Sequence, residues 1–207
     1  MRIKTFFATV IFALGASACA PIIEQPTRLS SIDAGPSVAV VDPSQWHVKD
    51  VRVNVPRTLH VSEANMFYPI ADIVWRGDPY GDRYEQVAKI IDDAVTQGVQ
   101  HLHGRQEVYI DIDVLRFHAL TEKARLFVGG THSIRYMMTV RDAKTGAILV
   151  GPKEVVADIV ALGGRKAIEA ERRGITQKVR ITSHLAAMTR EMFEGAEVDA
   201  RRMADNG

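Results

Sequence analysis

Asp111 and Asp113 are residues whose type and spacing could hold a hard cation. They lie two positions apart in the segment EVYIDIDVLRF, whose alternating apolar residues are typical of a β-strand. Side chains two apart on a strand share one face, and their carboxylate oxygens suit such ions. Arg135 and Arg141 lie on or beside the next predicted strand and carry the opposite charge. We therefore expect cross-strand ion pairs at these aspartates, and no metal site.

Other residue types that support catalysis do not form a recognisable set. His101 and His103 would point about 200° apart on a helix, so they could not share a metal ion there. Ser133 follows His132 directly, which places the two side chains on opposite faces of a strand. The sequence has neither a G-x-S-x-G motif nor a phosphate-binding glycine loop. We expect no catalytic residue and no cofactor, and predict that the protein is not an enzyme.

A candidate partner or ligand loop precedes the first predicted helix. It contains Trp75, Arg76, Asp78, Tyr80 and Arg83 within nine positions. Aromatic and arginine side chains of this kind are enriched where proteins bind partners, and a helix N-terminus attracts anions. The alternative is a plain turn that leads into the helix.

The first eighteen residues have the pattern of an export signal. Arg2 and Lys4 give a positively charged start, and the ten residues 5–14 carry no charge. This apolar run is half of the roughly twenty residues that a membrane-spanning helix needs. Small residues follow at positions 15–18, as a cleavage site requires. We expect residues 1–18 to be a signal peptide.

Cys19 follows directly on the predicted cleavage site and is the one cysteine of the 207-residue chain. The residues Ala16-Ser17-Ala18 fit ordinary secretory cleavage. Together with Cys19 they also resemble the lipobox of bacterial lipoproteins, apart from Ala16, where that family usually has leucine. The resemblance implies that Cys19 carries a thioether-linked diacylglycerol and becomes the new N-terminus. The alternative is a free exported cysteine, since a single cysteine forms no internal disulfide.

The lipobox-like site also has an implication for location. A lipoprotein carries two or three acyl chains, and several chains anchor a protein stably where one binds only marginally. Ala20 follows the cysteine, where many lipoproteins of the inner membrane have aspartate. The resemblance therefore implies a lipid anchor on the periplasmic side of the outer membrane. The alternative is a soluble periplasmic protein.

The charge balance argues against nucleic-acid binding. The chain has 26 basic and 25 acidic residues, a net charge of +1. Removal of the signal peptide would take away Arg2 and Lys4, leaving 24 basic residues and a net charge of −1. No strong positive field remains for a polyanion. We expect contact with the membrane through the lipid and with another envelope protein as partner.

The remaining chain divides into a tether, one domain and a tail. Residues 19–45 contain four prolines and no sustained periodicity, which predicts a flexible tether after the lipidated cysteine. Residues 46–195 are rich in periodic apolar patterns and predict a single globular α/β domain. Residues 196–207 are mostly charged or polar and predict a solvated C-terminal tail.

Periodicity within the domain predicts its elements. Val51, Val53 and Val55 alternate with polar residues, which indicates a first strand. Asp82 is a good N-cap for an amphipathic helix that ends near Gly104. Strands are predicted at 107–117, 133–140 and 154–162, with residues 147–150 as the second arm of a hairpin after 133–140, and a second amphipathic helix is predicted at 175–195.

These elements predict an α+β fold, in the form of a two-layer α/β domain. The order is β-α-β-β-β-α. Short turns join the later strands, so we expect a mainly antiparallel sheet of about four strands, covered by two amphipathic helices.

The layout of residues 51–162 resembles small uncharacterised lipoproteins of Gram-negative bacteria. The resemblance rests on the DAKTG hairpin, chiefly Asp142, Thr145 and Gly146. It implies an envelope lipoprotein of unknown function and assigns no catalytic residue. We expect an adaptor or accessory subunit that binds another envelope component. A carrier of lipid or a small ligand is one alternative, and an envelope hydrolase is the other.

Overall fold

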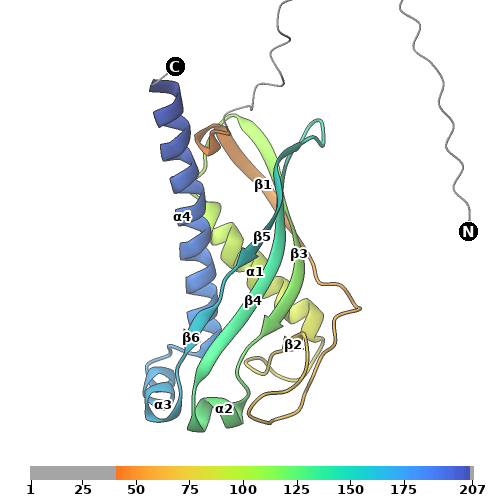
Figure 1. The fold of residues 1–207 in the computed structure, drawn as a ribbon, viewed down its shortest axis with the longest axis vertical. Coiled ribbons are helices and arrows are strands. Elements are labelled where there is room, and N and C mark those ends of the chain that lie inside the picture. Colours follow the sequence, from red (N-terminus) through yellow and green to blue (C-terminus); the bar gives the residue numbers. More distant parts are fainter. Residues whose placement is uncertain (1–40, 206–207) are drawn as a thin grey trace, which may run out of the picture. The chain divides into compact units, whose positions relative to one another are not determined.

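The computed structural model describes residues 41–205 of the chain. The predicted signal peptide, Cys19 and residues 19–40 of the predicted tether lie outside the described residues. Figure 1 shows the domain as a twisted sheet with helices packed on one side. No helix among residues 41–205 is long and apolar enough to span a bilayer.

The domain begins with a βαβ unit. A short 3-10 helix, η1 (Pro43–Gln45), leads into strand β1 (Trp46–Asn54), and Asp42 caps η1 by accepting a hydrogen bond from the Ser44 N–H. Helix α1 (Arg83–Val99) then crosses over to strand β3 (Gln106–His118), which runs parallel to β1. The predicted first strand and first helix are both present.

The N-terminus of α1 follows from its sequence. The Asp82 carboxylate accepts hydrogen bonds from the backbone N–H groups of Tyr84 and Glu85. The apolar stripe that begins with Val87 is buried along the whole helix. The helix ends at Val99, earlier than the predicted end at Gly104. Added side-chain atoms at Gly104 would collide with the backbone of Gln45, so the glycine allows a close approach of two segments.

The sheet has six strands and is mixed. Strand β3 (Gln106–His118) pairs with β1 in parallel and with β4 (Gly130–Asp142) in an antiparallel ladder. Strand β5 (Ile148–Val156) completes the main order β1-β3-β4-β5. Two short strands lie off this path: β2 (Ile73–Val74) pairs with β3, and β6 (Ile159–Ala161) pairs with β4.

The predicted α+β class is confirmed, and the strand count and pairing are refined. The structure has six strands where about four were expected, because the predicted last strand divides into β5 and β6 and β2 adds a short one. Both β1 and β2 pair with β3 in parallel. The remaining pairs are antiparallel, and the β4–β5 hairpin turns at the predicted Asp142–Gly146 segment.

Three further helices follow α1 along the chain. They are α2 (Glu122–Phe127), α3 (Gly164–Arg172) and α4 (Gln177–Asp205). The prediction of a tail from residue 196 was wrong, since α4 continues to Asp205. The last turns of α4 still have an inward face, on which Ala200 is buried. The Glu197 side chain is largely covered as well and is paired with Arg201.

The core lies between the sheet and two helices. Helices α1 and α4 pack against each other, and α1 also packs on β1 (Figure 1). The inward residues Val108, Ile110, Ile112 and Val114 of β3 are buried almost completely. The opposite side of the strands is polar, which is why these strands alternate in sequence.

Candidate functional site

Trp75, the first residue of the predicted binding loop, is a core residue. Its side chain is fully buried and packs edge-on against Phe117, with ring centroids 5.7 Å apart. Its indole N–H donates a hydrogen bond to Asp78 Oδ2 at 2.9 Å. Trp75 therefore has no surface to offer a partner, and it fixes the start of the loop instead.

Arg83 is almost as deeply buried as Trp75. Its guanidinium donates to both carboxylate oxygens of Glu63, at 2.6 and 3.1 Å. It also donates to the backbone carbonyls of Asp78 and Pro79 and to Gln86 Oε1. Hydrogen bonding from Arg83 holds the pKa of the Glu63 carboxyl below its ordinary value. The arginine joins the segment before α1 to the preceding loop.

Arg76 and Asp78 connect the same loop to α2 and α4. Arg76 Nε contacts Glu122 Oε2 at 2.5 Å, and Arg76 Nη1 donates to the Glu63 carbonyl at 2.7 Å. Asp78 accepts from Lys178 Nζ at 2.8 Å. Burial alone would raise the pKa of Asp78, but hydrogen bonds from Lys178 and Trp75 outweigh it and leave that pKa lowered.

Tyr80 differs from the other residues of the predicted loop because it is 87% exposed. Its ring lies beneath the Arg83 guanidinium, 5.7 Å from centroid to Cζ. The structure thus brings all five predicted residues together, but four of them tie elements of the domain to one another. The loop that the sequence singled out is chiefly a structural junction.

Seven of the fifteen large exposed apolar side chains within residues 41–205 lie elsewhere, on a surface formed by the 62–72 segment, α2 and the residue that follows α2. We call it the loop–α2 surface. Ile70 is 90% exposed and Phe127 70%, although both are apolar. The rings of Phe67 and Phe127 meet edge to face at 6.4 Å, so the two segments form one patch. The surface comprises Met66, Phe67, Tyr68, Ile70, Leu126, Phe127 and Val128.

Hydrogen bonds hold the backbone of the 62–72 segment in place. Ser62 N–H donates to the Ile73 carbonyl at 3.0 Å and closes the two ends of the loop. The Thr121 hydroxyl donates to the Met66 carbonyl at 2.7 Å, and Lys123 N–H donates to Asn65 Oδ1 at 2.9 Å. The apolar side chains are therefore presented on a fixed frame.

The middle of this loop is fixed by two side chains of β3. His118 is buried, with Nε2 2.9 Å from the Pro69 carbonyl, and its ring stacks on Tyr68 at 4.9 Å. Arg116 donates to the Tyr68 hydroxyl and to the Ala71 carbonyl. In the sequence, the run MFYPI was the one signal for this surface, and its lack of periodicity concealed it.

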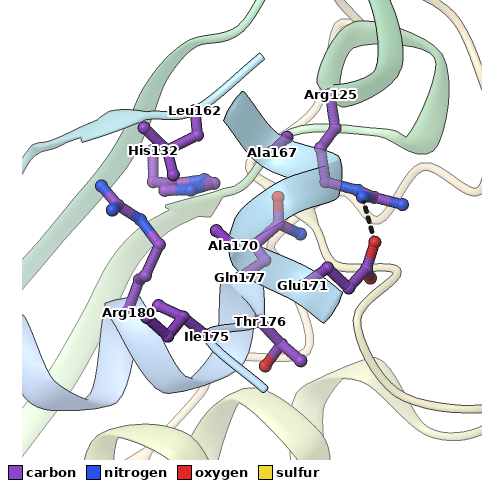
Figure 2. A pocket seen from close by; sticks show the side chains of 10 residues that line it. All are labelled: Arg125, His132, Leu162, Ala167, Ala170, Glu171, Ile175, Thr176, Gln177 and Arg180. Atoms are coloured by element: carbon purple, nitrogen blue, oxygen red, sulfur yellow. Dashed lines mark hydrogen bonds and ion pairs between the residues drawn. The ribbon is translucent and has the colours of Figure 1, made fainter. Parts of the chain in front are cut away.

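A second candidate site is a small pocket between β4, α3 and the first turns of α4. Figure 2 shows His132 and Arg180 on one side, the Arg125–Glu171 ion pair on the other, and Gln177 between them. The cavity measures about 20 Å³. His132 is 2% exposed, and burial lowers its pKa to about 4, with the positive charge of Arg180 acting in the same direction. The ring is therefore neutral near pH 7.

Of the two predicted aspartate ion pairs, only the one at Asp111 is found on the polar face of the sheet. Asp111 accepts from Arg141 Nε at 2.8 Å and is also paired with Arg52, while Asp113 accepts from Asn54 at 2.8 Å. The expected pairing with Arg141 is confirmed. Within residues 41–205 there is no group of three or more His, Cys, Asp or Glu side chains that could hold a metal ion.

His101 and His103 have separate environments. His101 Nδ1 lies 3.0 Å from the Gly98 carbonyl at the end of α1. The backbone of His103 forms an isolated bridge with His47 beside β1. The structure does not bring the two histidines together as metal ligands.

Comparison with known proteins places the domain in a family. The model of a family of unknown function, DUF6778, matches residues 46–206. The chain belongs to this family. The expectation of a domain of unknown function is thereby confirmed, and membership in DUF6778 assigns no activity. None of the curated proteins compared with the chain matches it.

Two solved structures similar to this DUF6778 domain are bacterial. One is a candidate lipoprotein from Caulobacter crescentus CB15, with 12% identity and a TM-score of 0.35, over 55% of this chain and 83% of that one. The other is a Xanthomonas campestris protein of the family DUF330, with 11% identity and a TM-score of 0.43, over 82% and 92% of the two chains. Both TM-scores are below 0.5, and neither carries a conclusion about function.

Proposed function

We propose that this protein is a lipid-anchored adaptor of the bacterial envelope, held by Cys19 and binding a partner protein through the loop–α2 surface. The observation that carries the proposal is this cluster of exposed apolar side chains on a fixed backbone. Exposed apolar patches rimmed by polar residues mark interaction sites on soluble proteins. The cluster includes side chains that are 67 to 90% exposed: Tyr68, Ile70, Phe127 and Val128.

The fixed frame of the loop favours binding in energetic terms. Ordering a flexible loop costs free energy when a complex forms, about 0.5–1.5 kcal/mol for each immobilised side chain. Here the hydrogen bonds from Thr121, Lys123 and Arg116 already hold the loop backbone. The aromatic rings of Phe67 and Phe127 are also partly fixed by their mutual contact.

The position of the surface suits a tethered protein. Residue 41 lies beside η1, at one end of the domain, and α2 lies at the opposite end (Figure 1). If a lipid on Cys19 holds the chain at the membrane, the predicted tether leads to the η1 end. The loop–α2 surface would then face away from that lipid and toward components of the periplasm.

The charges around the surface favour a protein partner over a lipid surface. Its rim carries the acidic side chains of Glu63 and Glu122 and the basic side chains of Arg116 and Lys123. A surface that binds anionic membranes carries an excess of basic residues. A mixed polar rim around an apolar centre is the usual composition of a protein interface.

Site-specific photocrosslinking in the envelope tests the proposal. A benzophenone amino acid replaces Phe127 in one strain and Ile148, a half-exposed residue of β5, in the control strain. We expect a defined protein adduct at position 127 that is absent at 148 and is lost when Ile70→Asp is added. Adducts at both positions, or one that survives Ile70→Asp, would overturn the adaptor proposal. A lipid adduct at position 127 would indicate that the surface contacts a membrane and not a protein partner.

A further inference from the structure

The pocket around His132 contains polar atoms without partners. Arg180 Nε and Gln177 Oε1 are buried and form no hydrogen bond within the described chain. The His132 side chain is 2% exposed and forms its hydrogen bond through Nδ1, which leaves Nε2 for a ligand in the pocket. An unpaired buried polar group destabilises a fold, and a charged one does so more strongly. The two unpaired atoms of Arg180 and Gln177 at one pocket indicate a missing ligand.

The hydrogen bond at Nδ1 of His132 determines whether Nε2 donates or accepts. The Leu120 backbone N–H donates to His132 Nδ1 at 3.3 Å. In a neutral imidazole the proton then resides on Nε2, which becomes a hydrogen-bond donor. The pocket thus offers a donor from His132 and a second donor from Arg180.

The charge of Arg180 specifies the kind of acceptor. Arg180 Nη2 donates to the Val160 carbonyl at 2.7 Å, but no carboxylate of residues 41–205 pairs with this guanidinium. The neighbouring Arg125 is paired with Glu171. A water molecule could satisfy the N–H groups, whereas an anion would also compensate the positive charge.

The size of the pocket limits the anion to a compact group. Its volume of about 20 Å³ is close to that of a site for one water molecule, and Leu162, Ala167 and Ile175 contribute apolar walls. An adjoining pocket of about 150 Å³ shares Thr176 and Gln177 with it. A ligand can place its charged end in the inner pocket and its body in the outer one, with Gln177 beside both.

We propose that this pocket binds the carboxylate of a small acid that carries a hydrogen-bond donor on the adjacent carbon, such as a 2-hydroxy or 2-amino acid. The carboxylate accepts hydrogen bonds from Arg180 Nε and His132 Nε2. The adjacent hydroxyl or ammonium donates to Gln177 Oε1. This assignment satisfies both buried unpaired atoms, uses Nε2 of His132 and gives Arg180 an anionic partner. It does not depend on the adaptor function.

Calorimetric titration of the purified protein with acetate, glycolate and glycine tests the ligand class. We expect glycolate or glycine to bind with a Kd on the order of 1 mM, as small ligands do. Acetate lacks the second donor and should bind about fivefold more weakly, the effect of one hydrogen bond. Tighter binding of glycolate would indicate a ligand with a hydroxyl on the adjacent carbon. Tighter binding of glycine would indicate an ammonium group there. Absence of binding by all three acids would overturn the proposal.

Variants connect the binding to the named atoms. Arg180→Gln should weaken glycolate about tenfold or more, whereas Arg172→Gln, an exposed arginine at the end of α3, should leave it unchanged. Gln177→Met should remove the preference for glycolate over acetate while acetate still binds, which shows that the pocket remains folded. Equal effects of the two arginine substitutions would contradict the site.

NMR of the His132 ring gives a second readout. A bound carboxylate favours the charged imidazolium, so saturating glycolate should raise the pKa of His132 from about 4. Arg125, Arg180 and Glu171 are the charged groups that line the pocket with it. An unchanged His132 titration in a protein that binds glycolate would place the acid at another site.

Discussion

Arg83 combines a full positive charge with a nearly complete exclusion from water. The ion pair with Glu63 and the backbone carbonyls of Asp78 and Pro79 supply the hydrogen bonds that water would otherwise provide. Breaking such a set leaves several acceptors unpaired at once, and this costs more than an exposed ion pair contributes.

Arg83→Met should therefore lower the free energy of unfolding by about 2 kcal/mol, because Glu63 and two carbonyls lose their donor. The matched control is Tyr80→Ala in the same loop, where the side chain is 87% exposed and the change should stay within about 0.5 kcal/mol. Urea denaturation of both variants measures the difference. Equal stabilities would mean that the buried guanidinium contributes nothing.

His132 predicts a dependence of stability on pH. Its pKa is about 4 in the folded chain against an ordinary value of 6.5, so between these values the unfolded chain binds a proton that the folded one does not. The free energy of unfolding should fall by about 3 kcal/mol as the pH is lowered from 6.5 to 4. Above pH 6.5 this contribution is complete and constant.

Urea midpoints measured between pH 4 and pH 7.5 test this dependence, with His132→Gln as the comparison. The variant has no ionisable ring, so its stability should change much less across the same range. Asp142, whose pKa is lowered to about 2 by hydrogen bonds from Gln106 and Thr145, acts below this window. Parallel curves for the two proteins would exclude His132 as the source.

Residues with local partners were the ones that the sequence could predict. Asp82 and Asp142 bond backbone N–H groups two or three positions on, so their roles follow from neighbours in the chain. Arg83 and His132 depend on Glu63 and on Leu120, which are 20 and 12 positions away. No periodicity or motif reports such distant contacts.

At the scale of elements, the crossing of α1 and α4 depends on one glycine. A Cβ atom at Gly98 would lie 2.7 Å from the Ala186 carbonyl oxygen and 2.7 Å from Thr189 Cβ. A backbone oxygen within a helix cannot move aside easily. The absence of a side chain at Gly98 thus sets how closely the two helices approach.

Gly98→Ala should lower the free energy of unfolding by about 1–3 kcal/mol, although alanine is the better helix former by about 1 kcal/mol. Gly195→Ala in α4 is the control, since its Cβ would meet no atom within 4 Å. That change should raise stability by up to about 1 kcal/mol. Thermal unfolding of the pair gives shifts of opposite sign, and a stabilising Gly98→Ala would disprove the tight crossing.

The elements themselves were predictable where their apolar period was long. Helix α1 and strands β1, β3 and β4 follow their sequence patterns closely. The parallel pairing of β1 with β3 was not predicted, since pairing depends on where α1 carries the chain and not on the pattern within a strand. Helix α2 and β2 are too short to produce a period.

At the scale of the whole molecule, the proposed anchor and the proposed docking surface belong to separate segments of the sequence. Cys19→Ser should abolish lipidation and move the protein from the membrane fraction to the soluble periplasmic fraction, because the proposed acyl chains supply the attachment. Fractionation with mass analysis of the mature N-terminus measures both effects. Ala20→Ser, a small change beside the cysteine, should leave the lipid and the membrane location intact.

A Cys19→Ser protein that stays in the membrane fraction would contradict lipid anchoring. Retention there after Ile70→Asp is added would further exclude the apolar surface as the source of attachment. The two substitutions together therefore separate the anchor from the docking surface.

The contact between the beginning and the end of the domain has a practical consequence. Trp46 packs edge-on against Phe193, with ring centroids 6.1 Å apart, and α4 contacts η1, so the last turns of α4 lie at the end where the described chain begins (Figure 1). A fluorescent protein or affinity tag fused after α4 would project from that end. It would leave Phe127 and Ile70 accessible, so that labelled protein can be used for imaging and pull-down without blocking the surface under test.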